Sequence, residues 1–94
     1  MDSPKYELET SSRFEKQYKK LSQAQKLQAK SLINRLLYDL PLEPKHKDHK
    51  LIGNYSGYRE CHIMPDLLLV YKKDKEALLL SCIRIGSHSE LFKK

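Results

Sequence analysis

The chain has 94 residues, of which 39% are hydrophobic and 32% are charged, and its formal net charge is +6. This length allows one modest hydrophobic core and excludes a second one, so we expect residues 1–94 to form a single domain. The composition is typical of a soluble globular protein, and the positive charge favours an anionic partner such as nucleic acid or a membrane surface.

The excess of positive charge is confined to one region of the chain. Residues 13–50 contain ten Lys/Arg against four Asp/Glu, whereas the remaining residues contain eight of each. A basic face from one region is typical of nucleic-acid binding, although a solvated helix surface would have the same composition. The N-terminus is polar and no long apolar run follows, so we expect no signal peptide, no membrane-spanning segment and a cytoplasmic protein.

The first predicted elements are a strand and then two helix N-termini that lie close together in the sequence. Residues 5–10 alternate apolar and polar side chains, which predicts a half-buried strand. Ser12 with Glu15, and then Ser22 with Gln25, have the spacing of capping boxes, in which each side chain satisfies a free backbone N–H at a helix start. Because the two starts are so close, we expect two helices joined in a tight hairpin.

Each predicted helix has one apolar face. The face is formed by Phe14, Tyr18 and Leu21 in the first helix, and by Ala29, Leu32, Ile33, Leu36, Leu37 and Leu40 in the second. Pro41 and Pro44 are expected to end the second helix. Leu27 and Tyr38 fall on its opposite side, where they are either a partner-binding surface or ordinary isolated apolar residues.

The second half of the chain is predicted to be a loop over residues 45–56, followed by three strands. These strands are expected at residues 58–64, 67–72 and 77–85. Gly86 interrupts the last strand, and residues 87–92 are expected to form a loop or a short C-terminal helical turn. The sequence therefore predicts an α+β fold of order β-α-α-β-β-β, with an N-terminal strand, a helical hairpin and a three-stranded antiparallel sheet.

Alternation along residues 58–64 assigns side chains to the two faces of that strand. One face is expected to carry Arg59, Cys61 and Ile63, and the other Tyr58, Glu60 and His62. Cys61 and Cys82 both fall in predicted strands without C-x-x-C spacing, so we expect buried free thiols in preference to a disulfide.

Several side chains around the predicted sheet suit the cleavage of RNA without a metal. That reaction needs a base for the 2′-hydroxyl, an acid for the leaving 5′-oxygen and cations for the phosphorane. Histidine suits both proton transfers because its ordinary pKa, about 6.5, lies near neutral pH, and arginine binds two phosphate oxygens at once. The candidates are His49, His62, His88, Arg59, Arg84 and Asp66. The ends of adjacent strands could bring His62 and His88 together.

Each candidate also has a purely structural explanation. A strand histidine is often half-buried with one hydrogen bond, and Asp66 after Pro65 suits a turn. The two arginines could pair with Glu60 or Glu90, and His46 is expected on the loop surface. A zinc site built from three histidines and an aspartate is a further alternative, but no histidine pair has His-x-x-x-His spacing, so we expect no metal and no cofactor.

Taken together, the motifs of residues 47–92 resemble those of YafQ-type toxins, which belong to the RelE superfamily of bacterial toxin–antitoxin systems. The motifs are Lys47-Asp48-His49 with Leu51 and Gly53, Gly57-Tyr58-Arg59-Glu60 with His62 and Pro65-Asp66, Val70-Tyr71, and Arg84 with Gly86-Ser87-His88-Ser89-Glu90-Leu91-Phe92. The resemblance covers the whole chain, because the helical hairpin also fits the family.

The resemblance implies a RelE-like microbial ribonuclease fold, cleavage of mRNA in the ribosomal A site, and inhibition by a co-encoded antitoxin in a hetero-oligomer. By motif matching, His49, His62, Asp66 and His88 take the catalytic positions. His88 would be the general acid, His49 or His62 would assist as base, and Asp66 would orient a histidine or take part in proton transfer.

The resemblance also implies substrate contacts. Phe92 would stack on or position a base, and Arg59 and Arg84 would meet phosphates. Some relatives carry an aromatic residue directly after the aspartate, where this chain has Leu67, so base stacking at that point is not expected to carry over.

Two other classes of function remain open from the sequence. One is an RNA- or ribosome-binding growth inhibitor that has the same fold and does not cleave. The other is a regulatory subunit that represses transcription only together with its antitoxin. The three matching histidines favour the endoribonuclease.

Overall fold

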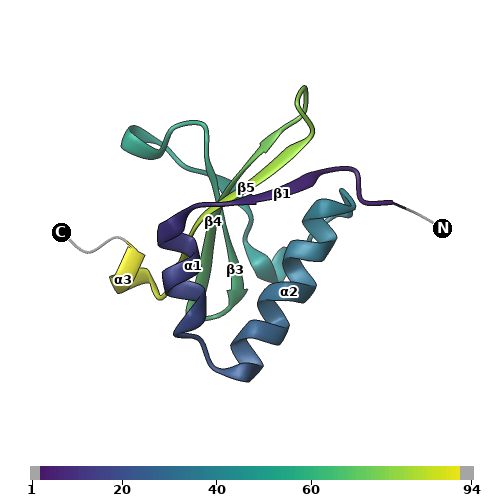
Figure 1. Ribbon diagram of the computed structural model, residues 1–94. Helices are drawn as coiled ribbons and strands as arrows, with labels where there is room; N and C mark the ends of the chain where they lie inside the picture. The colour runs from purple at the N-terminus through teal and green to yellow at the C-terminus, as the bar shows by residue number, and fades with distance from the viewer. Residues whose placement is uncertain (1–2, 92–94) are drawn as a thin grey trace.

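The computed structural model describes residues 3–91, in which two helices cover one face of a twisted five-stranded sheet (Figure 1). The strands are β1 (Glu7–Thr10), β2 (His49–Lys50), β3 (Arg59–Met64), β4 (Leu67–Asp74) and β5 (Leu79–Gly86). The helices are α1 (Ser12–Lys19), α2 (Gln23–Leu37) and α3 (His88–Leu91), with 3₁₀ turns η1 (Pro44–His46) and η2 (Gly53–Tyr55). The α+β class and the short C-terminal helix agree with the sequence-based expectation.

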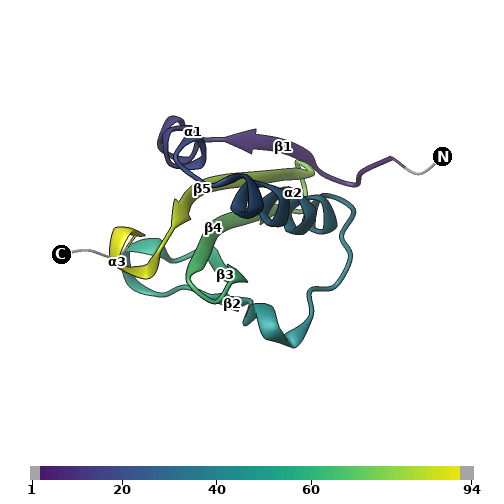
Figure 2. The same ribbon diagram turned by 90° about the horizontal axis from the view of Figure 1, so that it is seen from below.

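The strand order is β1-β5-β4-β3-β2, as Figure 2 shows from below. The three predicted strands form its antiparallel centre, but the expected three-stranded sheet is extended at both edges. β1 pairs with β5 in parallel. Parallel strands need a long connection, and the chain between β1 and β5, which includes both helices of the hairpin, is long enough. β2 adds two residues beside β3, and a strand that short shows no alternation by which a sequence could reveal it.

Both helices of the hairpin begin at a serine cap. Ser22 and Gln25 form the predicted capping box, with reciprocal bonds of 3.1 and 2.9 Å. At α1 the prediction was one residue too late, because the N-cap is Ser11, whose hydroxyl accepts a bond of 3.0 Å from the Phe14 N–H. Ser11 also donates to the carbonyl of Ile83 on β5, and this contact fixes where α1 starts.

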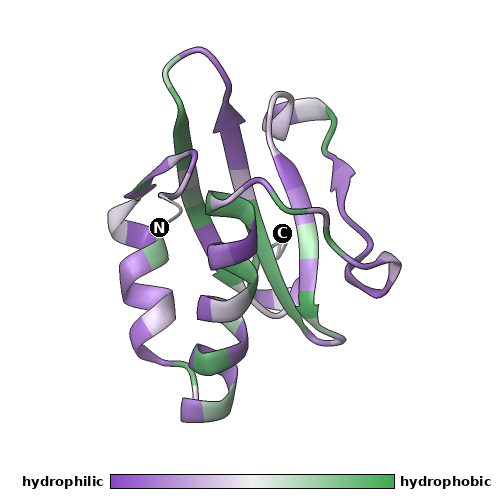
Figure 3. Cartoon of the chain, turned by 90° about the vertical axis from the view of Figure 1, so that its right-hand side faces the viewer, coloured by the Kyte–Doolittle hydropathy of each residue, from purple (hydrophilic) through white to green (hydrophobic). Residues whose placement is uncertain are grey.

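The main core lies between the helices and the sheet. Hydrophobic positions run along the central strands and recur on α2 (Figure 3). The buried residues of α2 are Ala29, Leu32, Ile33 and Leu36, as its predicted apolar face requires. Leu40 was assigned to this face but lies beyond the end of α2 and is 46% exposed. Cys61 and Cys82 are buried free thiols, as expected, and burial raises the pKa of Cys82 to about 12.

A second, smaller cluster lies on the opposite face of the sheet. It contains Leu68, Val70 and Leu91, with partly buried residues from the 51–58 loop packed against them. α3 and this loop therefore cover part of the face that the helical hairpin leaves open. Within residues 3–91, no helix is both long enough and apolar enough to cross a membrane.

Candidate active site

The register of the sheet brings three of the predicted residues to the face away from α1 and α2. His49 pairs with Glu60, which pairs with Val70, which in turn pairs with Arg84. Directly paired residues place their side chains on the same face, and Val70 belongs to the second cluster, so this row lies on that face. His62 follows two residues after Glu60, and therefore shares the face and stands diagonally across from His49. The predicted division of β3 into two faces is confirmed.

His88 is brought to the same end of the sheet by α3. His62 pairs with Leu68, which pairs with Gly86, and His88 follows Gly86 by two residues as the first residue of α3. α3 is held by a reciprocal cap, because Glu90 Oε1 accepts 2.8 Å from the Ser87 N–H while Ser87 Oγ accepts from the Glu90 N–H. Hydrogen bonds from the Ser87 backbone N–H and from the Ser87 side chain to the Glu90 carboxyl lower the pKa of that carboxyl. His88 itself is exposed.

Gly86 ends β5, two residues before the start of α3. A Cβ at Gly86 would lie 3.1 Å from Glu90 Oε1 and 3.4 Å from Leu91 Cδ2, so a side chain there would press on the cap that holds α3. The glycine that interrupts the predicted strand is therefore explained by the close packing of α3 against β5.

His49 is fixed at both ring nitrogens. Its Nδ1 lies 2.7 Å from the carbonyl oxygen of Lys47, and its Nε2 lies 3.4 Å from Oε1 of Glu60. Glu60 is the one charged residue buried among those described, at 6% exposure, whereas half of the His49 side chain is exposed. Both neighbouring atoms are acceptors, and a ring protonated at both nitrogens can donate to both. The buried carboxylate that orients His49 was not recognised in the sequence, where Glu60 was considered only as a partner for an arginine.

His62 is oriented differently. Its Nδ1 lies 3.4 Å from the carbonyl oxygen of Pro65, and its own carbonyl oxygen lies 2.6 Å from Nδ1 of His46. A donor at His62 Nδ1 leaves Nε2 of the neutral ring as a free acceptor. His46 was expected on the loop surface but is half-buried against β3 through this bond. An isolated loop histidine gives no sequence pattern that would reveal such a contact.

The two arginines lie on opposite faces. Arg84 shares the face of His49 and His62, and its guanidinium donates to the Tyr55 hydroxyl at 2.9 Å and to the Glu90 carbonyl at 3.3 Å. It therefore joins the 51–58 loop and α3 to the sheet.

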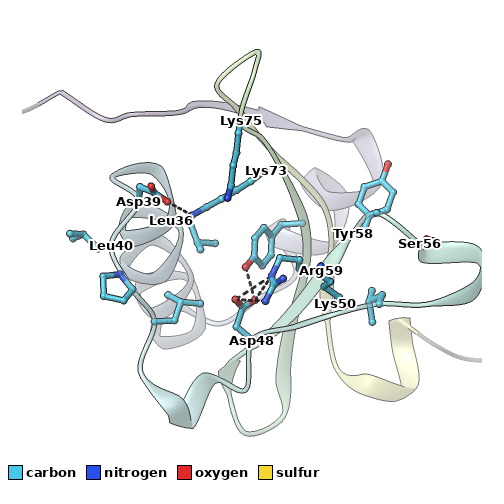
Figure 4. Close-up of a pocket in the computed structure, with 15 residues that line it drawn as sticks. Leu36, Asp39, Leu40, Asp48, Lys50, Ser56, Tyr58, Arg59, Lys73 and Lys75 are labelled. Atoms are coloured by element: carbon cyan, nitrogen blue, oxygen red, sulfur yellow. Dashed lines mark hydrogen bonds and ion pairs between the residues drawn. The ribbon is translucent and has the colours of Figure 1, made fainter.

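Arg59 points to the helix side, where its Nη2 lies 3.0 Å from Oδ2 of Asp48 (Figure 4). The hydroxyl of buried Tyr71 donates to Oδ1 of the same carboxylate at 2.5 Å. The bonds to Asp48 raise the pKa of Arg59, and burial together with Asp48 raises that of Tyr71. This network lines a cavity of about 720 Å³, which also contains Lys73, paired with Asp39.

Two remaining candidates complete the placement. Asp66 is exposed in the tight turn between β3 and β4. A turn after Pro65 is also the structural explanation that the sequence offers for Asp66. Phe92 lies outside the described residues. Within residues 3–91, no group of three or more His, Cys, Asp or Glu side chains is arranged to hold a metal ion.

The chain matches a family model across almost its whole length. The model describes the bacterial toxin of type II toxin–antitoxin system YafQ, and it matches residues 6–93. The chain belongs to the YafQ toxin family. The family resemblance of its sequence motifs is therefore confirmed.

Individual YafQ proteins support this membership. The Escherichia coli K12 protein named mRNA interferase toxin YafQ is 45% identical over 53 residues, or 56% of this chain and 55% of that protein. The matched segment thus spans about half the length of that curated relative.

Solved structures match over a longer range. YafQ from E. coli BL21(DE3) gives a TM-score of 0.82 at 34% identity over 93% of this chain and 98% of that one. The crystal structure of the E. coli DinJ-YafQ toxin-antitoxin complex gives a TM-score of 0.81 at 35% identity, and the match covers 94% of this chain and 98% of that one. A metal-bound toxin from Helicobacter pylori gives a TM-score of 0.78 at 41% identity, and the match covers 90% of this chain and 97% of that one. These matches confirm the α+β fold of the YafQ family.

Proposed function

We propose that this protein is the toxin of a type II toxin–antitoxin system and an endoribonuclease that cleaves mRNA in the ribosomal A site. The observation that carries the proposal is the placement of His49, His62 and Arg84 on one sheet face, with His88 at its end, in a chain of the YafQ family. The E. coli relatives are named mRNA interferase toxins. The net charge of +6 suits an RNA substrate.

The geometry suggests a distinct role for each histidine. His62, with Nδ1 directed at a carbonyl, presents Nε2 as the general base that removes the 2′-hydroxyl proton. The 2′-oxygen then attacks phosphorus, the bond from phosphorus to the 5′-oxygen breaks, and His88 protonates that oxygen. The products are a 2′,3′-cyclic phosphate and a 5′-hydroxyl.

His49 would act as a fixed positive charge in this scheme. If both ring nitrogens carry a proton, the ring donates to the Lys47 carbonyl and to Glu60, and its charge would lie beside the phosphorane while negative charge develops there. Asp66 would orient His62 or relay its proton from the adjacent turn. Phe92 and Arg84 are retained as candidate substrate contacts, whereas Arg59 is assigned to hold Asp48 because it faces away from the histidines.

The proposal includes an antitoxin as partner and the cytoplasm, where ribosomes translate, as location. One structural relative is described as a DinJ-YafQ toxin-antitoxin complex, and a hetero-oligomer of the same kind is proposed for this chain. A basic toxin suits an acidic antitoxin segment, and a charge-dominated complex should weaken as salt rises.

The test is expression of the wild type and His88→Ala in cells that lack the antitoxin, with primer extension on an abundant transcript. We expect growth arrest and in-frame cuts with the wild type and neither with the variant. Lys75→Gln is the matched control, because Lys75 is exposed in the β4–β5 turn, at the opposite end of these strands from the Leu68–Gly86 pair that precedes His88, and the change should leave both effects intact. Arrest without cuts would favour the non-cleaving inhibitor instead, and no arrest would favour the regulatory subunit.

A further inference from the structure

A hollow of about 390 Å³ lies beside His62, at the end of the sheet that β3 and η1 share. His46 and Lys47 form one side of it, Met64 and Pro65 form the other, and Gln28 of α2 reaches it from the helix layer. It is separate from the larger cavity around Asp48 and Arg59. The mechanism above uses the backbone carbonyl of Lys47, but it uses no side chain of His46, Lys47 or Met64.

We propose that this hollow binds the nucleotide next to the cleaved phosphodiester, an inference that rests on the proposed ribonuclease function. A nucleotide combines an anionic phosphate with a flat base whose edges are polar. The hollow combines the cation of Lys47 with the apolar surfaces of Met64 and Pro65 and the amide of Gln28. Its volume is at the lower end of the range of about 300–1,000 Å³ for small-molecule sites, which fits one nucleotide better than a protein segment.

The position of the hollow ties it to the reaction. His62 forms part of its wall and is also the proposed general base. In this hollow we therefore place the nucleotide next to the one that presents its 2′-hydroxyl to His62. Nδ1 of His46 lies 2.6 Å from the carbonyl oxygen of His62. A nucleotide that contacts His46 would therefore be coupled to the backbone of His62, the proposed general base.

The side chain of Lys47 is free to meet a ligand, whereas its backbone has a structural role. Lys47 has a φ of 46°, in the left-handed region that favours glycine or asparagine. Its ammonium group has no hydrogen-bond or ion-pair partner inside residues 3–91. The left-handed φ is that of a helix C-cap, because Lys47 ends η1 and its N–H donates to the Pro44 carbonyl at 3.0 Å. The binding role therefore rests on an unpartnered lysine that lines the hollow.

Two methionines in the chain make the test direct, because Met64 lies in the hollow and Met1 begins the chain. The protein is labelled with ¹³C at the methionine methyl groups and titrated with a trinucleotide RNA in which the scissile 2′-hydroxyl is replaced by hydrogen. We expect the Met64 methyl signal to shift while the other methyl signal stays in place. His88→Ala should show the same shift, because it removes the chemistry and not the hollow.

Variants at Lys47 separate charge from folding. Lys47→Gln should weaken binding of the trinucleotide several-fold and reduce the slope of log K against log salt by about 0.7, as expected for one lost phosphate contact on a single strand. Lys47→Gly should weaken binding equally while the melting temperature stays within a few degrees, since glycine accepts the positive φ. Lys75→Gln, with the same change of charge, should not alter the slope.

The inference is overturned if the trinucleotide binds without a Met64 shift, or if Lys47→Gln and Lys75→Gln weaken binding equally. A shift produced by an acidic peptide of equal charge and not by RNA would also overturn it. Cleavage that persists in cells under any of these results leaves the ribonuclease proposal standing, so the two failures can be told apart.

Discussion

Removal of a single hydroxyl group from Tyr71 tests the network on the helix side of the sheet. Tyr71 is 1% exposed, and its hydroxyl donates to Asp48 at 2.5 Å. Because the acceptor is charged, Tyr71→Phe should cost about 2 kcal/mol of the free energy of unfolding. For a domain of this size, that loss lowers the melting temperature by about 8–16 °C.

Tyr6→Phe is the matched control, because Tyr6 is 2% exposed and its buried hydroxyl has no partner within residues 3–91. The same chemical change there removes an unsatisfied polar group, so stability should stay equal or rise. Thermal and urea unfolding followed by circular dichroism at pH 7 would measure both variants. Equal stability of Tyr71→Phe and the wild type, or a larger loss for Tyr6→Phe, would refute the reasoning.

The pH dependence gives a second check on the same bond. Burial and Asp48 raise the pKa of Tyr71 above its ordinary value of 10.0, so the folded protein keeps the hydroxyl protonated. The stabilisation is complete below pH 10.0 and is lost as the pH rises above it, because the unfolded chain then ionises and the folded one does not. The difference between Tyr71→Phe and the wild type should therefore be constant near neutrality and shrink above pH 10.0.

Two further predictions concern α3 and the end of α2. Glu90→Ala removes the carboxylate that caps α3 at Ser87, so cleavage should fall at least several-fold with little change in melting temperature; unchanged cleavage of a reporter transcript would show that α3 does not position His88. Asp39 pairs with two lysines that lower its pKa, so Asp39→Asn should be less stable than the wild type at pH 7. That difference should fade as the pH falls below 3.8, the ordinary value for this carboxyl, and a difference that persists in acid urea unfolding would contradict the assignment to charge.

Local patterns in the sequence were enough to predict the helical hairpin, the three central strands and the two faces of β3. Each of those features repeats over several residues, so a period of 3.6 or 2 can be recognised. The edge strand β2 could not be predicted, because two residues do not define a period. The parallel pairing of β1 with β5 joins residues about seventy positions apart, and only the packed core decides it.

The site was predictable in its residue types but not in its partners. Histidines near strand ends can be identified from the sequence, whereas the contact between His46 and the His62 carbonyl crosses sixteen positions without a repeating pattern. Arg59 was expected to meet phosphate because arginine does so in general. In the structure its partner is Asp48, eleven positions earlier, and this pairing depends on the face of β3 that Arg59 occupies.

The hydrogen bond from the Tyr71 hydroxyl to Asp48 also bears on the proposed chemistry, because Asp48 precedes His49 in the chain. Asp48 and His49 are neighbours in the chain, yet Asp48 bonds to Tyr71 and Arg59 on the helix side while His49 meets Glu60 on the opposite face. A shift of one residue between β2 and β3 would exchange the two faces and move His49 away from the other histidines. β2 pairs with β3 over only two residues, and one further backbone bond, from the Leu51 N–H to the Tyr58 carbonyl, continues the pairing. Tyr71 and Arg59 together fix Asp48 and so help to hold the register in which His49 faces the proposed substrate site. Tyr71→Phe should therefore slow cleavage in addition to destabilising the fold.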